Sequence, residues 1–370
     1  MPTQPKTAIA LWQAGVDAVG GYAALASALQ SHPSAPPDQI IAVGKAAGAM
    51  ARAALDHFGV VPTLVVTKDG HGADLPDHVR LIEAAHPVPD ARSLSAGRAL
   101  RETVQAMPTG SRLLALISGG ASALAEDLVP GKTLADLAAL NQQLLAEGLG
   151  IGAMNARRRK LSQIKGGGLL GHFNGAEVQV LAISDVPGDD LAVIGSGIGS
   201  APDAPRFRFQ AHIIASNTHA RDAAAAAARA QGLAVLACEE TLHDNLTALA
   251  PRLGARLRSM APGVMILGGE PMVILPPNPG QGGRNQALAL ALAREIAGTT
   301  GLTIVVGGTD GSDGPTQAAG AVVDGTTWGD GAAEALQAAN SGAYLQAKNA
   351  LLVTGPTGTN VMDLIIALRA

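Results

Sequence analysis

The sequence contains little cysteine, few aromatic residues and little charge. Its single cysteine, Cys238, excludes an internal disulfide framework and a zinc site built mainly from cysteine. Charged residues make up 15% of the chain and the formal net charge is -4, a balance that does not favour nucleic acid as a partner. No apolar run approaches the ~20 residues of a membrane-spanning helix, and the N-terminus has no signal-peptide cleavage pattern. These absences predict a cytoplasmic enzyme or binding protein.

Glycine is abundant instead: the 370 residues include 46 glycines, many of them in turns. Together with the alanine-rich helical segments, this composition is typical of an α/β protein. The length predicts two domains. We expect residues 1–240 to form an N-terminal Rossmann-like α/β domain and residues 241–370 to form a C-terminal α/β domain, each with a parallel or mixed sheet. A boundary anywhere from about 235 to 262 fits the composition.

Short apolar runs predict the strands of these sheets. They are Gln39–Val43, Val60–Thr67, Val79–Ala85, Arg112–Ile117, Glu177–Ile183, Ala211–Ala215, Leu233–Ala237, Val264–Leu267, Leu302–Val306, Leu351–Val353 and Leu364–Leu368. A further apolar run, Met272–Leu275, predicts a strand that either forms a hairpin with Val264–Leu267 or makes a second edge segment. Polar, glycine-rich loops repeatedly follow these runs. Because open α/β sheets bind ligands at the carboxyl ends of their strands, the loops predict an active site in a cleft between the two domains.

The stretch from Gly263 to Arg294 is the most informative of these segments. An apolar run leads into the loop PPNPGQGGRN, and a helix without a breaker begins at Asn285. A glycine-rich loop that enters a helix presents backbone N–H groups at the positive end of the helix dipole, which suits a phosphate. Arg284 stands at this junction with a planar fork of donors. The alternative, about equally favoured by this stretch alone, is a solvent-facing arginine on an ordinary connection.

Two further strand-to-helix junctions are candidate anion sites. Lys45 follows Gly44 directly after a strand, where its ammonium would lie near a bound anion; a surface lysine is the alternative. The sequence around Lys45 is not a Walker loop, because only one glycine precedes the lysine. Ser118-Gly119-Gly120-Ala121-Ser122 combines two hydroxyls with bare amides that suit a carboxylate or phosphate, or forms a tight turn with a serine cap. It lacks the Gly-x-Ser-x-Gly spacing of a serine hydrolase.

Two loops carry closely spaced carboxylates. Asp185, Asp189 and Asp190 follow one predicted strand, and Asp310 and Asp313 follow another. Carboxylate oxygens are ligands that Mg²⁺ prefers, and Mg²⁺ needs only one or two of them beside phosphate oxygens. Turn formation and helix capping by aspartate are the structural alternative.

Taken together, the motifs resemble the glycerate 2-kinase family of the MOFRL type. The matching blocks are VGKAAGAM, HPVPD, SGGASAL, the Asn-x-x-Arg segment with LSQIKGGGL, SDVPGDD, GGEP with GQGGRNQ, GTDGSDGPTQAAGA and TGPTGTNVMDL, which run in the family's order from about residue 40 to 365. The resemblance implies two α/β domains with the active site between them. It also implies transfer of the γ-phosphate of ATP to the C2 hydroxyl of D-glycerate, with a divalent cation.

The resemblance also implies roles for individual residues. Lys45 and Arg284 match the family's active-site lysine and arginine, and we expect both to be catalytic. The two carboxylate loops described above supply the expected metal-binding residues, Asp189 and Asp310, and ATP and Mg²⁺ are the expected cofactors. The expected substrate- or phosphate-binding residues are Ser118, Gly119, Gly120, Ser122, Asn155, Arg158, Gly282, Gly283 and Thr309.

The chain departs from the family pattern at three places. Arg158-Arg159-Lys160 stands where the family usually has Arg-Lys-His, the run from Ser196 to Asp203 differs from the family's SGPTVPDP-like run, and the segment near residues 326–350 is short. These differences bear on which small hydroxy acid is the acceptor.

Two other functions remain as alternatives. A hydroxypyruvate reductase would need a nicotinamide site, and the G-x-G-x-x-G spacing occurs once, at Gly166, Gly168 and Gly171, after a basic segment and not after a strand. A non-catalytic sensor of sugar acids or nucleotides is the other alternative, disfavoured by the presence of both Lys45 and Arg284. The expected partners are D-glycerate and ATP, with no nucleic acid or membrane partner and with a homodimer left open.

Overall fold

The computed structural model describes residues 3–72, 74–146 and 157–370. The chain divides into two compact units, and each is described by itself. The parallel-sheet unit comprises residues 20–216 and the short segment 358–360. The mixed-sheet unit comprises the N-terminal residues up to Val19 together with residues 217–357 and 361–370.

The parallel-sheet unit is built on six parallel strands in the order β3-β2-β1-β4-β5-β6. Their bounds are β1 Gln39–Val43, β2 Thr63–Lys68, β3 Arg80–Ala84, β4 Arg112–Ile117, β5 Glu177–Ile183 and β6 Arg208–Ala215. The order reverses between β1 and β4, which pair in register up to Val43 and Ile117. In such doubly wound sheets the loops at this reversal are the usual place of a ligand.

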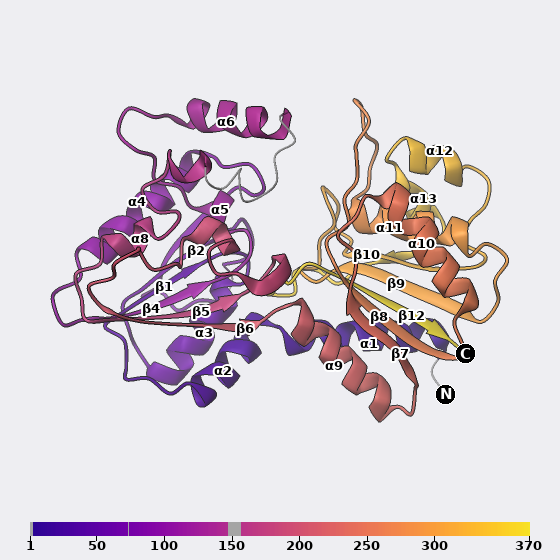
Figure 1. Ribbon diagram of the computed structural model, residues 1–370, viewed down its shortest axis with the longest axis horizontal. Coiled ribbons are helices and arrows are strands. Elements are labelled where there is room, and N and C mark those ends of the chain that lie inside the picture. The colour runs from indigo at the N-terminus through magenta and orange to yellow at the C-terminus, as the bar shows by residue number, and fades with distance from the viewer. Residues whose placement is uncertain (1–2, 73, 147–156) are drawn as a thin grey trace. The chain divides into compact units, whose positions relative to one another are not determined.

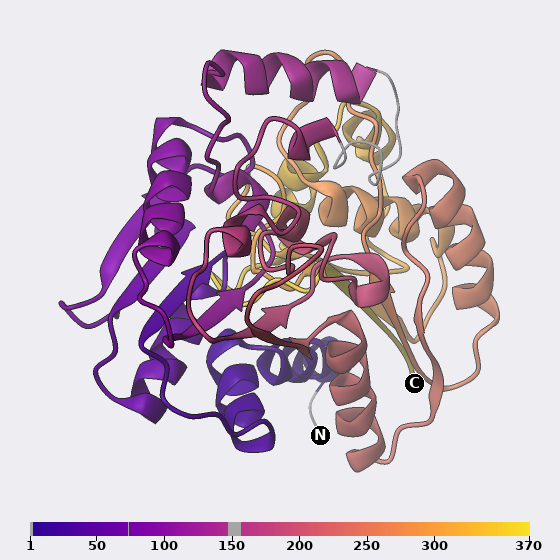
Figure 2. The same cartoon turned by 60° about the vertical axis from the view of Figure 1, so that its left-hand side comes forward.

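Helices cover both faces of this sheet (Figures 1 and 2). One face carries α2 (Gly21–Ser31) and α3 (Ala47–Phe58). The other carries α4 (Ala91–Gln105), α5 (Ala121–Leu124) and α8 (Gly168–Gly171), which pack on the side chains of alternate strand residues such as Ile41 and Val43. The further elements of the unit are α6 (Leu134–Ala146), at its outer margin, and the short 3-10 turns η1 (Pro187–Asp189) and η2 (Ile194–Gly197).

The mixed-sheet unit also has a six-stranded sheet, in the order β11-β10-β9-β12-β8-β7. Its strands are β7 Val235–Glu240, β8 Gly263–Gly269, β9 Leu302–Gly308, β10 Gly320–Asp324, β11 Leu351–Leu352 and β12 Asp363–Arg369. The last strand, β12, is inserted antiparallel between β8 and β9. It is buried along almost its whole length, so the C-terminal segment completes the core of this unit.

Two layers of helices enclose the mixed sheet (Figure 1). On one face α1 (Gln4–Ala18) and α9 (Asn217–Ala230) pack around Trp12. On the other face lie α10 (Leu246–Ser259), α11 (Arg284–Glu295), α12 (Ala332–Gln337) and α13 (Ser341–Ala347). Residues 285–293 of α11 are all buried, as expected of a helix surrounded by protein on every side.

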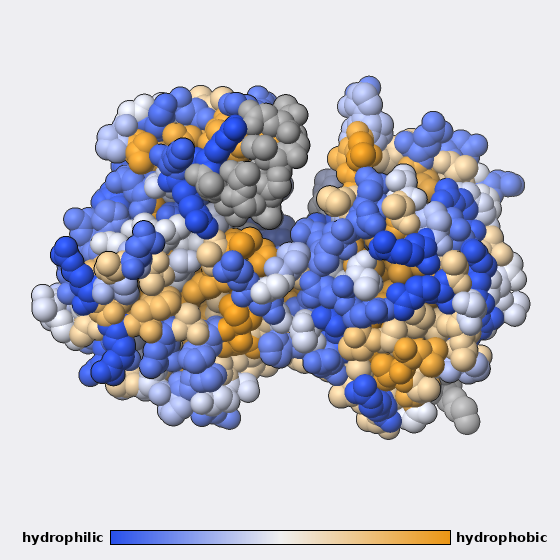
Figure 3. Space-filling view, viewed as in Figure 1, coloured by the Kyte–Doolittle hydropathy of each residue, from blue (hydrophilic) through white to orange (hydrophobic). Residues whose placement is uncertain are grey.

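The predicted fold class is confirmed: both units are α/β, one with a parallel sheet and one with a mixed sheet. The prediction of a strand at Met272–Leu275 is wrong, because this segment has only one isolated bridge, from Met272 to Asn245, and exposes its side chains. Figure 3 shows a patch of hydrophobic residues, coloured orange, at the base of the loop that projects from this unit.

The division into packing units differs from the predicted contiguous boundary at residues 240 and 241. The first helix and residues 217–240 pack with the C-terminal sheet, because α1 and α9 cover one face of that sheet and β7 pairs with β8. The predicted domain boundary between residues 240 and 241 stays a prediction.

In the described part of the chain, every helix is too short or too polar to cross a membrane.

Candidate active site

In the parallel-sheet unit, the loops after β1 and β4 are joined to each other. The backbone N–H of Lys45 donates to the carbonyl oxygen of Gly119 at 2.9 Å, and the N–H of Ala46 donates to Oγ of Ser118 at 3.1 Å. These loops lie side by side because β1 and β4 are neighbours at the point where the strand order reverses. The structure therefore brings together Lys45 and the Ser118–Gly120 turn, which the sequence indicated as separate anion sites.

Ser118 has a structural task in this arrangement. Its side chain is fully buried, and a Cβ on Gly44 would lie 2.2 Å from its hydroxyl oxygen. The hydroxyl thus connects the two loops across a close approach that only glycine at position 44 permits. Direct binding of a ligand by Ser118 stays a prediction.

Gly119 and Gly120 allow other side chains to approach the same turn. A Cβ on Gly119 would lie 2.3 Å from Oδ2 of Asp185 and 2.4 Å from Nδ2 of Asn360. Asn360 itself donates to Asp185 at 3.3 Å. A Cβ on Gly120, whose φ is +84°, would lie 3.2 Å from the ring of His86. Strand ends far apart in the sequence thus converge on one turn.

His86 and Asn360 are therefore additional candidates beside Lys45. In the sequence, His86 begins the block HPVPD directly after the predicted strand Val79–Ala85. Asn360 lies in the segment 358–360, which returns to this unit from the end of the chain. No local pattern in the sequence indicates that return.

The remaining predicted residues of this unit lie on neighbouring loops. The Oγ atoms of Ser122 and Ser196 are 2.8 Å apart and share a hydrogen bond. Arg158 is half-buried; burial lowers its pKa, and the carboxylate of Glu126 opposes that shift. Glu126 also accepts a hydrogen bond from Nζ of Lys165 at 2.5 Å, both side chains being buried. Asn155 lies outside the described residues.

In the mixed-sheet unit, Arg284 begins α11 and is held by two carboxylates. Its Nε donates to Oδ2 of Asp363 at 2.6 Å, its Nη2 donates to Oδ1 of Asp363 at 3.2 Å, and its Nη1 donates to Glu270. Burial opposes the charged form of Arg284, but Asp363 and Glu270 together raise its pKa above the usual value. Burial raises the pKa of Asp363, which is 1% exposed, and the charge of Arg284 opposes that shift.

Asp313 occupies the positive end of α11. Its carboxylate accepts hydrogen bonds from the backbone N–H groups of Asn285, at 3.0 Å, and Gln286, at 2.8 Å. Burial raises the pKa of Asp313 to about 7, against these hydrogen bonds and the charge of Arg284. The expectation that these helical N–H groups are open to a phosphate is therefore wrong, because a carboxylate of the chain already binds them.

The glycine-rich loop before α11 retains donors of its own. Within the described ranges, no residue accepts a hydrogen bond from the backbone N–H of Gly282 or Gly283, and both residues are partly exposed. A Cβ on Gly283 would lie 2.2 Å from Cγ of Asp313, so this glycine lets the loop approach the capping carboxylate. Phosphate binding by Gly282 and Gly283 stays a prediction.

Thr309 and Asp310 follow β9. The hydroxyl of Thr309 donates to the carbonyl oxygen of Met362 at 2.7 Å and accepts from the N–H of Val361 at 2.9 Å, which fixes the entry to β12. Oδ1 of Asp310 accepts from the N–H and the hydroxyl of Ser312. Binding of a ligand by either residue stays a prediction.

The described residues contain no group of three or more histidine, cysteine, aspartate or glutamate side chains placed to hold a metal ion. Asp189 lies in η1 of the parallel-sheet unit, whereas Asp310 lies in the mixed-sheet unit. In these parts of the chain, no such cluster is available to bind a cation through protein groups alone.

The G-x-G-x-x-G spacing at Gly166, Gly168 and Gly171 does not have the setting of a dinucleotide site. The segment before it contains one isolated bridge at Ser162 and turns, and the helix that follows, α8, has four residues. A dinucleotide fingerprint requires a strand before the glycines and a longer helix after them.

Two family models match the chain. The model described as a domain of unknown function, DUF4147, covers residues 7–231, and the MOFRL family model covers residues 263–363. A D-glycerate 2-kinase of Thermotoga maritima is 35% identical over 384 residues, which cover 89% of this chain and 90% of the relative. A protein of Agrobacterium vitis, provisionally named a hydroxypyruvate reductase, is 36% identical and covers 88% of this chain and 97% of its own.

The fold matches a solved structure as well. The crystal structure of a glycerate kinase from Thermotoga maritima superposes with a TM-score of 0.87 at 32% sequence identity, covering 99% of both chains. The two-unit architecture described above is therefore shared over the full length.

Replacement of Gly283 tests the structural role of the glycine-rich loop. We expect Gly283→Ala to lower the melting temperature, because the added Cβ collides with the buried Asp313 and displaces it from the end of α11. Gly171→Ala is the matched control, since a Cβ there meets no atom within 4 Å. Equal melting temperatures for the two variants in a thermal scan would contradict this account of the loop.

Proposed function

This chain belongs to the glycerate kinase family with DUF4147 and MOFRL domains, and we propose that it transfers the γ-phosphate of ATP to the C2 hydroxyl of D-glycerate. The products would be ADP and 2-phosphoglycerate. The observation that carries the proposal is the nearly full-length similarity to a D-glycerate 2-kinase. A cytoplasmic location and a homodimer stay predictions.

Lys45 is proposed as a cation for the reacting anions. It lies at the reversal of the parallel sheet, where the backbone of the Ser118–Gly120 turn is hydrogen-bonded to its own. Phosphoryl transfer depends mainly on positioning and on stabilisation of charge. An ammonium held at this position would bind the oxygens of a phosphate or of the glycerate carboxylate.

Arg284 is proposed as a second cation, fixed in advance of the reaction. Of the five N–H donors of its guanidinium, three bind Asp363 and Glu270, and the other two donate to no other described residue. Donors that are already oriented stabilise developing charge without reorganisation. The nearby N–H groups of Gly282 and Gly283 would add neutral donors to the same anion.

Mg²⁺ fits this proposal as a partner of the nucleotide. The donor chemistry is suitable, because Asp189 and Asp310 offer carboxylate oxygens, and one or two carboxylates beside phosphate oxygens suffice for Mg²⁺. The lack of a three-residue metal cluster among the described residues agrees with a cation bound largely through phosphate. Such a cation would supply neutralisation of the phosphate charge.

The position of the phosphate on the product tests the proposed reaction. An assay coupled to enolase should respond to ATP, Mg²⁺ and D-glycerate without added phosphoglycerate mutase, because enolase accepts the 2-phosphate ester. A response that requires the mutase would show that the 3-hydroxyl is phosphorylated and would refute the proposed regiochemistry.

Substitutions of Lys45 and Arg284 test the two cations. We expect Lys45→Ala to lower turnover by about 10²-fold or more with little change in melting temperature. Arg284→Ala should lower both turnover and melting temperature, because it leaves the buried Asp363 without its partner. Arg284→Lys keeps the positive charge but loses the bidentate fork, so it should retain more stability and only part of the turnover.

The matched control is Lys132→Ala, which removes an exposed lysine of the same unit as Lys45. Near-normal kcat and KM in Lys45→Ala or Arg284→Ala would remove that residue from the mechanism.

Asp310→Asn and Asp189→Asn test the metal assignment. We expect at least one of them to raise the Mg²⁺ concentration needed for half-maximal turnover, because a neutral amide is a weaker ligand. Asp330→Asn, an exposed carboxylate of the mixed-sheet unit, is the control. If the Mg²⁺ dependence is the same in all three variants, both candidate aspartates are structural.

A further inference from the structure

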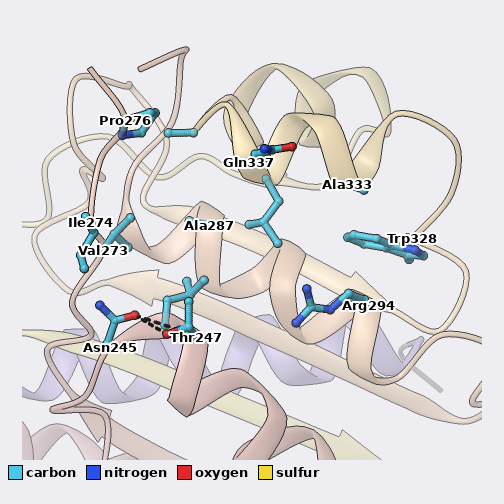
Figure 4. A pocket seen from close by; sticks show the side chains of 13 residues that line it. Asn245, Thr247, Val273, Ile274, Pro276, Ala287, Arg294, Trp328, Ala333 and Gln337 are labelled. Carbon is cyan, nitrogen blue, oxygen red and sulfur yellow. Dashed lines mark hydrogen bonds between the residues drawn. The ribbon is translucent and has the colours of Figure 1, made fainter. Parts of the chain in front are cut away.

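A pocket of about 570 Å³ lies within the mixed-sheet unit, beside α11. Its walls come from the start of α10, from α12 and from the segment before the glycine-rich loop. Figure 4 shows Trp328 and Arg294 at one end, Ile274 and Pro276 at the other, and Ala287 of α11 between them. None of the candidate residues discussed above lines this pocket.

The chemistry of the lining suits a flat, weakly polar group. Trp328 is half-buried and packs against the core of the unit, and the neighbouring walls are mainly aliphatic. The chain has two tryptophans, and the other, Trp12, is completely buried. An indole at the wall of a pocket offers a large stacking surface for a planar heteroaromatic ring.

One wall residue of the pocket contacts the glycine-rich loop. The wall residue Ala339 has its carbonyl oxygen 3.6 Å from the position of a Cβ on Gly282, and the N–H of Gly280 donates to the carbonyl oxygen of Ala338. The end near Pro276 thus adjoins the loop whose N–H groups at Gly282 and Gly283 are not used within the described chain.

Helix α11 sets the distance between the pocket and Arg284. Arg284 begins the helix, Arg294 lies in its last turn at the wall of the pocket, and ten residues of helix span about 15 Å. A ligand with a planar base near Trp328 would place a chain of phosphates at the glycine-rich loop and Arg284.

We propose that this pocket binds the adenosine of ATP, with the adenine ring stacked on Trp328. The inference rests on the proposed kinase function and assigns the nucleotide to residues of the mixed-sheet unit alone. It requires no residue of the parallel-sheet unit for recognition of the base.

Trp328→Ala tests the stacking contact. We expect it to raise KM for ATP about tenfold and to leave KM for D-glycerate unchanged, whereas Trp328→Phe, which keeps an aromatic ring, should raise KM for ATP less. Inhibition by inorganic tripolyphosphate, which has no base, should be equal in all three proteins. Leu236→Ala, which removes an exposed apolar side chain of β7 in the same unit, is the control.

Tryptophan emission gives a readout independent of turnover. Titration with ADP and Mg²⁺ should change the emission of the wild-type protein, and Trp328→Phe should abolish most of that change, since Trp12 is buried elsewhere in the unit. The inference would be overturned if Trp328→Ala left KM for ATP unchanged and Trp328→Phe left the emission response to ADP unchanged. It would also be overturned if Trp328→Ala weakened inhibition by tripolyphosphate as much as it weakened the use of ATP. A wild-type protein that binds ADP through Trp328 but does not phosphorylate D-glycerate would instead refute the proposed function.

Discussion

The buried carboxylate of Asp363 is the constraint on which much of the mixed-sheet unit depends. It is 1% exposed and begins β12, where it binds Arg284 and accepts from Nδ2 of Asn285 at 2.9 Å. Its carbonyl oxygen accepts from Asn217 at the start of α9. A buried charge requires a close partner of opposite sign, so the position of Arg284 follows from the fold and not from a flexible surface loop. The central strand, α9 and the proposed catalytic cation thus share one polar network.

The order of strands, loops and helices could be predicted from the sequence because apolar runs and glycine-rich loops are local signals. Lys45 and Arg284 could be predicted in the same way, since Lys45 lies between a strand and a helix and Arg284 lies between a glycine-rich loop and a helix. The partners of Arg284 could not be predicted, because Asp363 is 79 residues away and precedes a run that indicates only a terminal strand. The same holds for Asp313, whose capping of α11 requires the tertiary fold. Asn360 reaches the Ser118–Gly120 turn only through the return of residues 358–360.

The glycines of the two loops have a structural role in addition to their proposed role in ligand binding. Gly119 admits Asp185 and Asn360 to the turn after β4, and Gly283 admits Asp313 to the start of α11. A sequence motif cannot distinguish a glycine needed for a bound phosphate from one needed for a neighbouring side chain. In both loops the glycine permits the close packing that would orient the proposed ligand-binding groups, so the two roles are compatible.

In the proposed function, this polar framework serves phosphate transfer from ATP to D-glycerate. Phosphorus NMR of the protein with ATP, Mg²⁺ and D-glycerate detects both products in one experiment. We expect ADP and the monoester signal of 2-phosphoglycerate to grow in equal amounts. Formation of inorganic phosphate without a new ester, together with NADH oxidation when hydroxypyruvate replaces D-glycerate, would contradict the proposed function.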